Sequence, residues 1–176
     1  PGFTAGSDVS ILEDSGAQSL AWASGISAGP VDESAQGLVF NILSNNNADL
    51  FENQPQLASD GTLTFTAKAD SSGVALLEIQ LMDDGGTANG GVDVSTVETL
   101  TITIEAVNDA PGFTAGSDVS IPEDAGAQSL AWASGISAGP ADELGQVLTF
   151  NILSNNNANL FENQPQLASD GTLTFT

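Results

Sequence analysis

The chain has 176 residues and a formal net charge of −22, because 23 Asp and Glu residues stand against one basic residue, Lys68. Such a charge excludes nucleic acids and anionic membranes as natural partners, since both are polyanionic. The chain contains no cysteine, histidine or tyrosine, so the usual ligands of zinc, iron–sulfur clusters and haem are missing, as is the base of a Ser–His–Asp triad.

Short segments in which apolar and polar residues alternate predict strands along the first 110 residues, and no segment has a helical period. About seven short strands, separated by turns rich in Gly, Asn, Asp and Pro, are typical of an immunoglobulin-like β-sandwich. We therefore predict an all-β fold with the Leu, Ile, Phe and Trp side chains of these strands in its core. No apolar run is long enough to insert into a membrane. The predicted strands lie at residues 8–11, 19–26, 38–42, 50–51, 62–66, 77–81 and 100–104.

Residues 111–176 repeat residues 1–66, and 58 of the 66 aligned positions are identical. Five of the eight differences fall between residues 31 and 39, which predicts a loop leading into a strand. We divide the chain into a complete repeat, 1–110, and a truncated second copy, 111–176, which lacks the last two strands. Residues 67–110 are expected to complete the first copy. The second copy then stays incomplete, continues in a longer polypeptide or receives strands from another chain.

The two copies meet at residues 106–111, Ala-Val-Asn-Asp-Ala-Pro, called the linker below. Asn108 and Asp109 place an amide oxygen and a carboxylate there, and Pro111 stiffens the chain beyond them. Calcium takes six to eight oxygen ligands, so the linker and the acidic turns around it predict a Ca²⁺ site. The alternative is that these carboxylates only keep the surface soluble. The acidic turns of the first copy hold Glu13 and Asp14, Asp32 and Glu33, Asp60, Asp70, and Asp83 and Asp84.

These features resemble a cadherin-like repeat of the kind found in tandem in large bacterial surface proteins. The linker resembles the cadherin motif Asp-x-Asn-Asp-Asn-x-Pro, although Ala106 replaces the first Asp and one Asn is missing. Residues 121–124 and, in the first copy, 12–14 resemble the Pro-Glu-Asn-Glu motif. Residues 142–143 resemble the Asp-x-Asp motif, whereas the cadherin Asp-Arg-Glu triplet is reduced to Asp60. We therefore expect the chain to bind fewer Ca²⁺ ions than an animal cadherin does, or to bind them more weakly.

In such arrays calcium lies between neighbouring repeats, and the resemblance implies the same here. The implied calcium ligands at the junction are Glu13, Asp70, Asn108, Asp109, Asp142 and Glu143. Weaker candidates for calcium ligands are Asp14, Asp32, Glu33, Asp83 and Asp84. Of these, Asp32, Glu33, Asp83 and Asp84 would face a preceding repeat.

The resemblance implies a structural and adhesive function, in which calcium stiffens a spacer in a long extracellular adhesin or filament and the partners are neighbouring repeats. One alternative is a carbohydrate-binding module of a secreted protein, which needs exposed aromatic residues. Trp22 and Trp132 each lie in an apolar segment instead. Another is a polymer subunit that exchanges strands between copies. An enzyme is not expected, because neighbouring carboxylates in a turn point in different directions. The glycine-rich residues 84–93 predict a hairpin loop, not a phosphate cradle.

Overall fold

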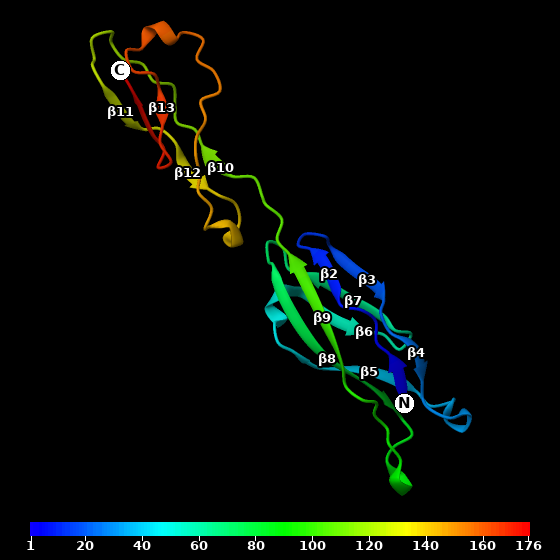
Figure 1. The fold of residues 1–176 in the computed structure, drawn as a ribbon. Coiled ribbons are helices and arrows are strands. Elements are labelled where there is room, and N and C mark those ends of the chain that lie inside the picture. Colours follow the sequence, from blue (N-terminus) through cyan, green and yellow to red (C-terminus); the bar gives the residue numbers. More distant parts are fainter. The chain divides into compact units, whose positions relative to one another are not determined.

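The computed structural model describes all residues 1–176 and divides the chain into two compact units, Pro1–Val107 and Asn108–Thr176. Both units consist of strands and loops (Figure 1). The helical segments are all 3-10 turns of three residues, and none of them is able to cross a bilayer. The prediction of an all-β fold is therefore confirmed. The turns are η1 (Val31–Glu33), η2 (Ala48–Leu50), η3 (Ala88–Gly90), η4 (Ala141–Glu143) and η5 (Ala158–Leu160).

The larger sheet of the first unit has four strands in the order β2-β9-β8-β5. β2 (Val9–Leu12) runs parallel to β9 (Glu98–Glu105), which pairs antiparallel with β8 (Gly73–Asp83). β8 pairs antiparallel with β5 (Leu38–Asn45) at the other edge. The loop and strand predicted between residues 31 and 42 are thus present, as η1 and β5.

A second sheet of the first unit has three antiparallel strands in the order β3-β7-β6. Its central strand, β7 (Thr62–Ala67), pairs with β3 (Ala17–Ala21) and β6 (Phe51–Leu57). A further short pair joins β1 (Gly2–Thr4) to β4 (Ser24–Ser27).

One apolar core joins the two larger sheets, as in a β-sandwich. On β8, Leu77, Ile79 and Leu81 are completely buried, whereas Leu76, immediately before Leu77, is 41% exposed. This alternation follows from the two-residue period of a strand. From the other sheet, Leu63 and Phe65 of β7 join the same core.

The single strand predicted at residues 19–26 is wrong, because the segment forms β3 and β4 with a break at Trp22 and Ala23. Both of these residues donate their backbone N–H to the carbonyl oxygen of Gly61, at 2.9 and 3.0 Å. The indole N–H of Trp22 donates to the carbonyl oxygen of Ser7 at 3.0 Å, and the side chain is 5% exposed. A contact with a turn distant in sequence therefore interrupts the strand.

Replacing Gly61 by alanine is expected to lower the free energy of unfolding of the first unit by more than about 2 kcal/mol. Gly61 has φ +87, and a Cβ there would overlap the Ala23 carbonyl oxygen. Gly16→Ala is the matched control, because Gly16 has φ +73 but no atom close to the position of a Cβ. The Gly16→Ala variant should lose only about 1 kcal/mol of unfolding free energy. Urea unfolding followed by Trp22 fluorescence, in a Trp132→Phe background, measures both. Equal losses would contradict the described contact.

The glycine-rich segment forms the loop between β8 and β9, in line with the sequence-based prediction. Gly86 and Gly90 have φ of 74 and 85, and Asn89 between them also has a positive φ. These are conformations that glycine and asparagine adopt most readily.

The second unit contains fewer strands than the first. β10 (Gly112–Thr114) pairs with β12 (Ser134–Ser137), in the same way as β1 pairs with β4. β14 (Thr172–Phe175) pairs with β11 (Gln128–Ala131) and with β13 (Gln166–Leu167).

Two segments of the second unit are not strands although their sequence forms strands in the first. Residues 148–155 differ from β5 at one position only, and residues 119–122 differ from β2 at one position. In the first unit β5 and β2 pair with β8 and β9, for which the second unit has no counterpart. Pairing partners, not local sequence, therefore decide whether these segments are strands.

Candidate functional site

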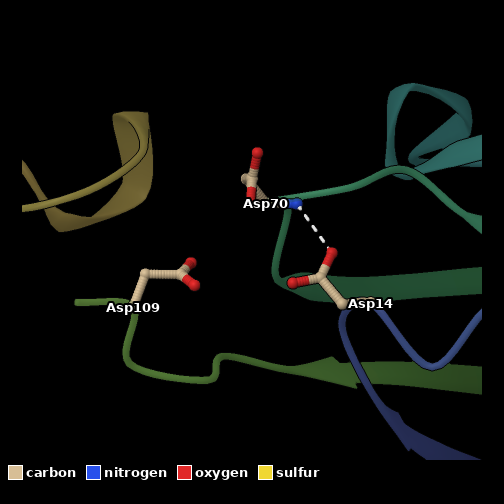
Figure 2. Close-up of side chains that lie close together, drawn as sticks. All are labelled: Asp14, Asp70 and Asp109. Carbon is tan, nitrogen blue, oxygen red and sulfur yellow. Dashed lines mark hydrogen bonds between the residues drawn. The ribbon is translucent and has the colours of Figure 1, made fainter.

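Two aspartates of the first unit, Asp14 and Asp70, come from different turns and lie close together. Asp14 belongs to that turn and Asp70 to the turn between β7 and β8, and both are exposed. Their φ angles are 58 and 53, a left-handed conformation that aspartate tolerates better than most residues. The N–H of Asp70 donates to Asp14 Oδ1 at 3.4 Å, and the two carboxylates lie within 4.8 Å of each other. Figure 2 draws this pair with its hydrogen bond, together with Asp109.

Glu13, the neighbour of Asp14, is a buried carboxylate with a 2% exposed side chain. Its backbone N–H donates to the carbonyl oxygen of Glu105 at 2.9 Å, and its Oε1 accepts the N–H of Val107 at 2.6 Å. Its second oxygen, Oε2, is buried and has no hydrogen-bond partner. The end of β9 and the start of the linker thus bury Glu13. The equivalent Glu123 is exposed in the second unit, which has no counterpart of β9.

A second buried glutamate, Glu143, holds the other half of the linker within the second unit. Its side chain is 4% exposed, and its Oε1 accepts the N–H of Asp109 at 2.6 Å. Its Oε2 is buried and without a partner. Gln146 donates from Nε2 to Asn108 Oδ1 at 3.0 Å. Predicted ligand atoms of Asn108 and Glu143 are therefore engaged in fixing the linker.

A glycine lies directly against each of the glutamates in the 3-10 turns η1 and η4. Gly139 has φ +154, and a Cβ there would overlap Glu143 Oε2. Gly29, at the equivalent position of the first unit, has φ +147 and lies in the same way against Glu33 Oε2. The neighbouring aspartates, Asp32 in the first unit and Asp142 in the second, are exposed.

The remaining predicted ligands, Asp83 and Asp84, lie at the end of β8 and each accept a backbone N–H. Asp83 is buried, and its Oδ1 accepts the N–H of Gly85 at 3.0 Å. Asp84 Oδ1 accepts the N–H of Gly37 at 2.8 Å. The Asp84 hydrogen bond connects the loop before β5 to the end of β8.

Asp60 stabilises a turn of its own, away from this acidic group. Its Oδ1 accepts the N–H of Thr62 at 2.9 Å, and this hydrogen bond to the charged form lowers the pKa of Asp60 below its ordinary value. Asp170 of the second unit accepts from Thr172 in the same way, and its pKa is lowered for the same reason.

The chain supplies no positive group to its buried glutamates. Its one basic side chain, Lys68, is exposed. A buried carboxylate oxygen without a donor or a cation is costly in a protein interior. The Oε2 atoms of Glu13 and Glu143 are two such oxygens. Carboxylate and carbonyl oxygens suit hard cations such as Ca²⁺.

Two features were missed at the level of sequence: the contact of Gln146 with Asn108 of the linker and the close approach of Gly139 to Glu143. A signal was available only for Gln146, because its equivalent Gln36 is identical within residues 31–39, where five positions differ. Gly139 lies outside this variable stretch and had no such signal.

No family model matches the chain, and a search of the curated proteins finds no match. The candidate site is therefore interpreted from its own chemistry. The first unit contributes the carboxylates of Glu13, Asp14 and Asp70, and Glu13 accepts the N–H of Val107. Within the second unit, Glu143 accepts the N–H of Asp109.

Proposed function

We propose that the chain is a structural module of tandem β-sandwich repeats, of the cadherin-like kind, whose linker is stiffened by Ca²⁺. The proposal rests on the hydrogen bonding of the two buried glutamates. Glu13 and Glu143 each bind a linker N–H with one oxygen, and each has a second buried oxygen without a partner. A cation bound near the linker would offset the buried negative charge of these carboxylates and would give their free oxygens a partner.

Chain connectivity alone brings the linker oxygens to the acidic end of the first unit. Glu13 holds Val107, and Asp109 follows only two residues later. Two residues span at most roughly 7 Å. Asp109 and the backbone carbonyls around it are therefore always within reach of the end of the first unit that carries Asp14 and Asp70. This holds for every orientation of the second unit.

The oxygen set suits Ca²⁺ better than Mg²⁺. Calcium accepts six to eight oxygens at irregular angles, whereas magnesium requires a near-ideal octahedron. Asp14 and Asp70 are exposed and come from separate turns, which gives an adaptable set of ligands. Extracellular calcium modules bind at about 10⁻⁴–10⁻³ M, and we propose this range and an extracellular location for the present chain. Bound calcium would also relieve repulsion in a chain of net charge −22.

The carbohydrate-binding alternative receives less support from the first unit. Trp22 is buried and its indole N–H is used by the Ser7 carbonyl oxygen. Its ring is therefore not presented to a sugar, which normally stacks on an exposed aromatic face. The structural function remains the better supported of the two.

Thermal unfolding of the chain in Ca²⁺, in Mg²⁺ and in chelator tests this function. A ligand at one hundred times its Kd stabilises the folded state by about 2.7 kcal/mol, which corresponds to about 10 °C or more for a unit of this size. We expect this rise in Ca²⁺ and a much smaller one in Mg²⁺. An unfolding temperature that is the same in all three solutions would show that the acidic turns bind no ion and only keep the surface charged.

A further inference from the structure

The loop between β8 and β9 holds a pair of residues that the proposed function does not use. Asn89 is followed by Gly90, and this is the only Asn-Gly pair of the chain. Residues 84–92 are all exposed, and in Figure 1 the loop, drawn in green, extends beyond the strand ends of the first unit. Both residues are therefore open to water.

An asparagine followed by glycine contains the atoms for a reaction of the chain with itself. The backbone nitrogen of the residue after an asparagine can attack the side-chain carbon Cγ and close a five-membered ring. Glycine leaves this nitrogen uncrowded, because it has no Cβ. Every other asparagine of the chain is followed by a residue with a side chain, so Asn89 is the asparagine at which the attack is least hindered.

The side-chain amide of Asn89 makes no hydrogen bond, in contrast to its counterparts before β6. Asn46 Oδ1 accepts the N–H of Leu76 at 2.8 Å, and Asn47 donates from Nδ2 to the carbonyl oxygen of Val74 at 3.2 Å. These contacts hold the amides of Asn46 and Asn47 in place. The amide of Asn89 is free to rotate toward the next backbone nitrogen.

Two Asp-Gly pairs of the first unit contain the atoms for the same ring, but their reacting groups are bound. Asp60 and Asp84 each accept a backbone N–H with Oδ1, at 2.9 and 2.8 Å. The N–H groups of Gly61 and Gly85, which would attack, donate to other oxygens at 2.9 and 3.0 Å. An ionised carboxylate is also a poorer electrophile than an amide. The structure therefore favours Asn89 over these aspartates.

The turn around Asn89 has to open before the ring closes. The N–H of Gly91 donates to the carbonyl oxygen of Ala88 at 3.0 Å, and Asn89 has φ 57 and ψ 25, as in a type I′ turn. This ψ directs the nitrogen of Gly90 away from the Asn89 side chain. Exposed hydrogen bonds in a loop without buried side chains open at low free energy, so the reactive conformation is accessible in the folded chain.

We propose that Asn89 is a site of spontaneous covalent modification in the folded chain. The nitrogen of Gly90 bonds to Cγ of Asn89, the bond from Cγ to the side-chain nitrogen breaks, and that nitrogen leaves as ammonia with the proton from Gly90. Water then opens the succinimide ring by breaking one of its two carbonyl–nitrogen bonds. Opening at the side-chain carbonyl gives aspartate, and opening at the backbone carbonyl gives isoaspartate.

The modification changes the loop and leaves the sandwich intact. Either product adds a carboxylate to a segment that already holds Asp84 and Asp93 and has no basic residue, which increases local repulsion. Isoaspartate also adds one carbon to the backbone of the turn. The hydrogen bond from Gly91 to Ala88 should therefore weaken, whereas the core is unaffected, because residues 84–92 are exposed.

The test is incubation of the full chain at mildly alkaline pH in water enriched in heavy oxygen, followed by peptide mapping with mass spectrometry. We expect Asn89 to convert before every other asparagine, with release of ammonia and one heavy oxygen in the product. The rate should rise with pH, because the attacking nitrogen loses its proton. Isoaspartate, detected by enzymatic methylation of its free α-carboxylate, should accompany aspartate.

Two glycine variants separate the attack by Gly90 from the flexibility of the loop. Gly86 and Gly90 have φ of 74 and 85, and neither has an atom close to the position of a Cβ. Alanine therefore strains the loop to a similar extent at both positions, but only Gly90→Ala crowds the attacking nitrogen. Gly90→Ala should slow conversion of Asn89 at least about tenfold, and Gly86→Ala should change it by less than about threefold.

A parallel incubation of the chain unfolded in urea completes the test. Conversion of Asn89 in urea but not in the folded chain would overturn the inference, because the closed turn would then protect the site. Earlier conversion of Asn46, Asn47 or any other asparagine in the folded chain would also overturn it. Equal rates in Gly86→Ala and Gly90→Ala would show that the nitrogen of Gly90 is not the attacking group.

Discussion

Replacing Leu77 by alanine is expected to lower the free energy of unfolding of the first unit by about 2–5 kcal/mol, the range for a large apolar side chain removed from a packed core. Leu77 is completely buried in β8, opposite Leu100 of β9 and Asn45 of β5. It therefore packs at the centre of the strand pair that closes the sandwich. Urea unfolding followed by Trp22 fluorescence in a Trp132→Phe background measures the loss.

Leu76→Ala is the matched control for this prediction. Leu76 is the neighbour of Leu77 on the same strand, has the same side chain and points to the opposite face, where it is 41% exposed. Its replacement should cost no more than about 1 kcal/mol. A loss as large as that of Leu77→Ala would mean that the faces of β8 are not assigned correctly.

Replacing Asp70 by asparagine is expected to weaken Ca²⁺ binding at least tenfold and to remove most of the thermal stabilisation by Ca²⁺, because calcium sites are tuned by the number of charged ligands. Asparagine has nearly the same size and adopts the left-handed conformation of Asp70 as readily. The fold without calcium should therefore change little. Calorimetric titration of Ca²⁺ into the chelator-treated chain measures the affinity.

Asp49→Asn is the matched control for the charge. It also removes one carboxylate from the first unit, and the second copy already carries asparagine at the equivalent position, Asn159. Asp49 lies in η2, outside the proposed ligands, so its replacement should leave the affinity within about twofold. If both variants weaken binding equally, calcium responds to net charge alone. Glu13→Gln, which keeps an acceptor for Val107, tests the buried carboxylate in the same titration.

The sequence predicted those strands whose alternation is local, including β5, β7, β8 and β9. It did not predict the break between β3 and β4, because the carbonyl oxygen of Gly61 that causes it lies about forty residues away in the chain. It also could not show that residues 148–155 remain unpaired, since their sequence matches β5 at all but one position. Strand formation depends on a partner that local sequence does not contain.

For the candidate site, residue types were predictable and their contacts were not. Acidic residues at strand ends indicated Glu13, Asp14 and Asp70 as oxygen donors. That Glu13 is buried follows from Glu105, at the end of β9, and from Val107, both more than ninety residues away. The same holds for Glu143, whose bond to the linker N–H depends on how η4 folds back onto Asp109.

The measurement that tests the central claim most directly is the distribution of distances between spin labels on the two units, with and without Ca²⁺. The native chain has no cysteine, so Ser19→Cys and Ser129→Cys place labels at two equivalent, exposed strand positions, in β3 and β11. The account predicts a broad distribution in chelator and in Mg²⁺ that becomes narrow in Ca²⁺, and that stays broad in Ca²⁺ when Asp70→Asn is added. A distribution of the same width in all conditions would contradict a linker stiffened by calcium.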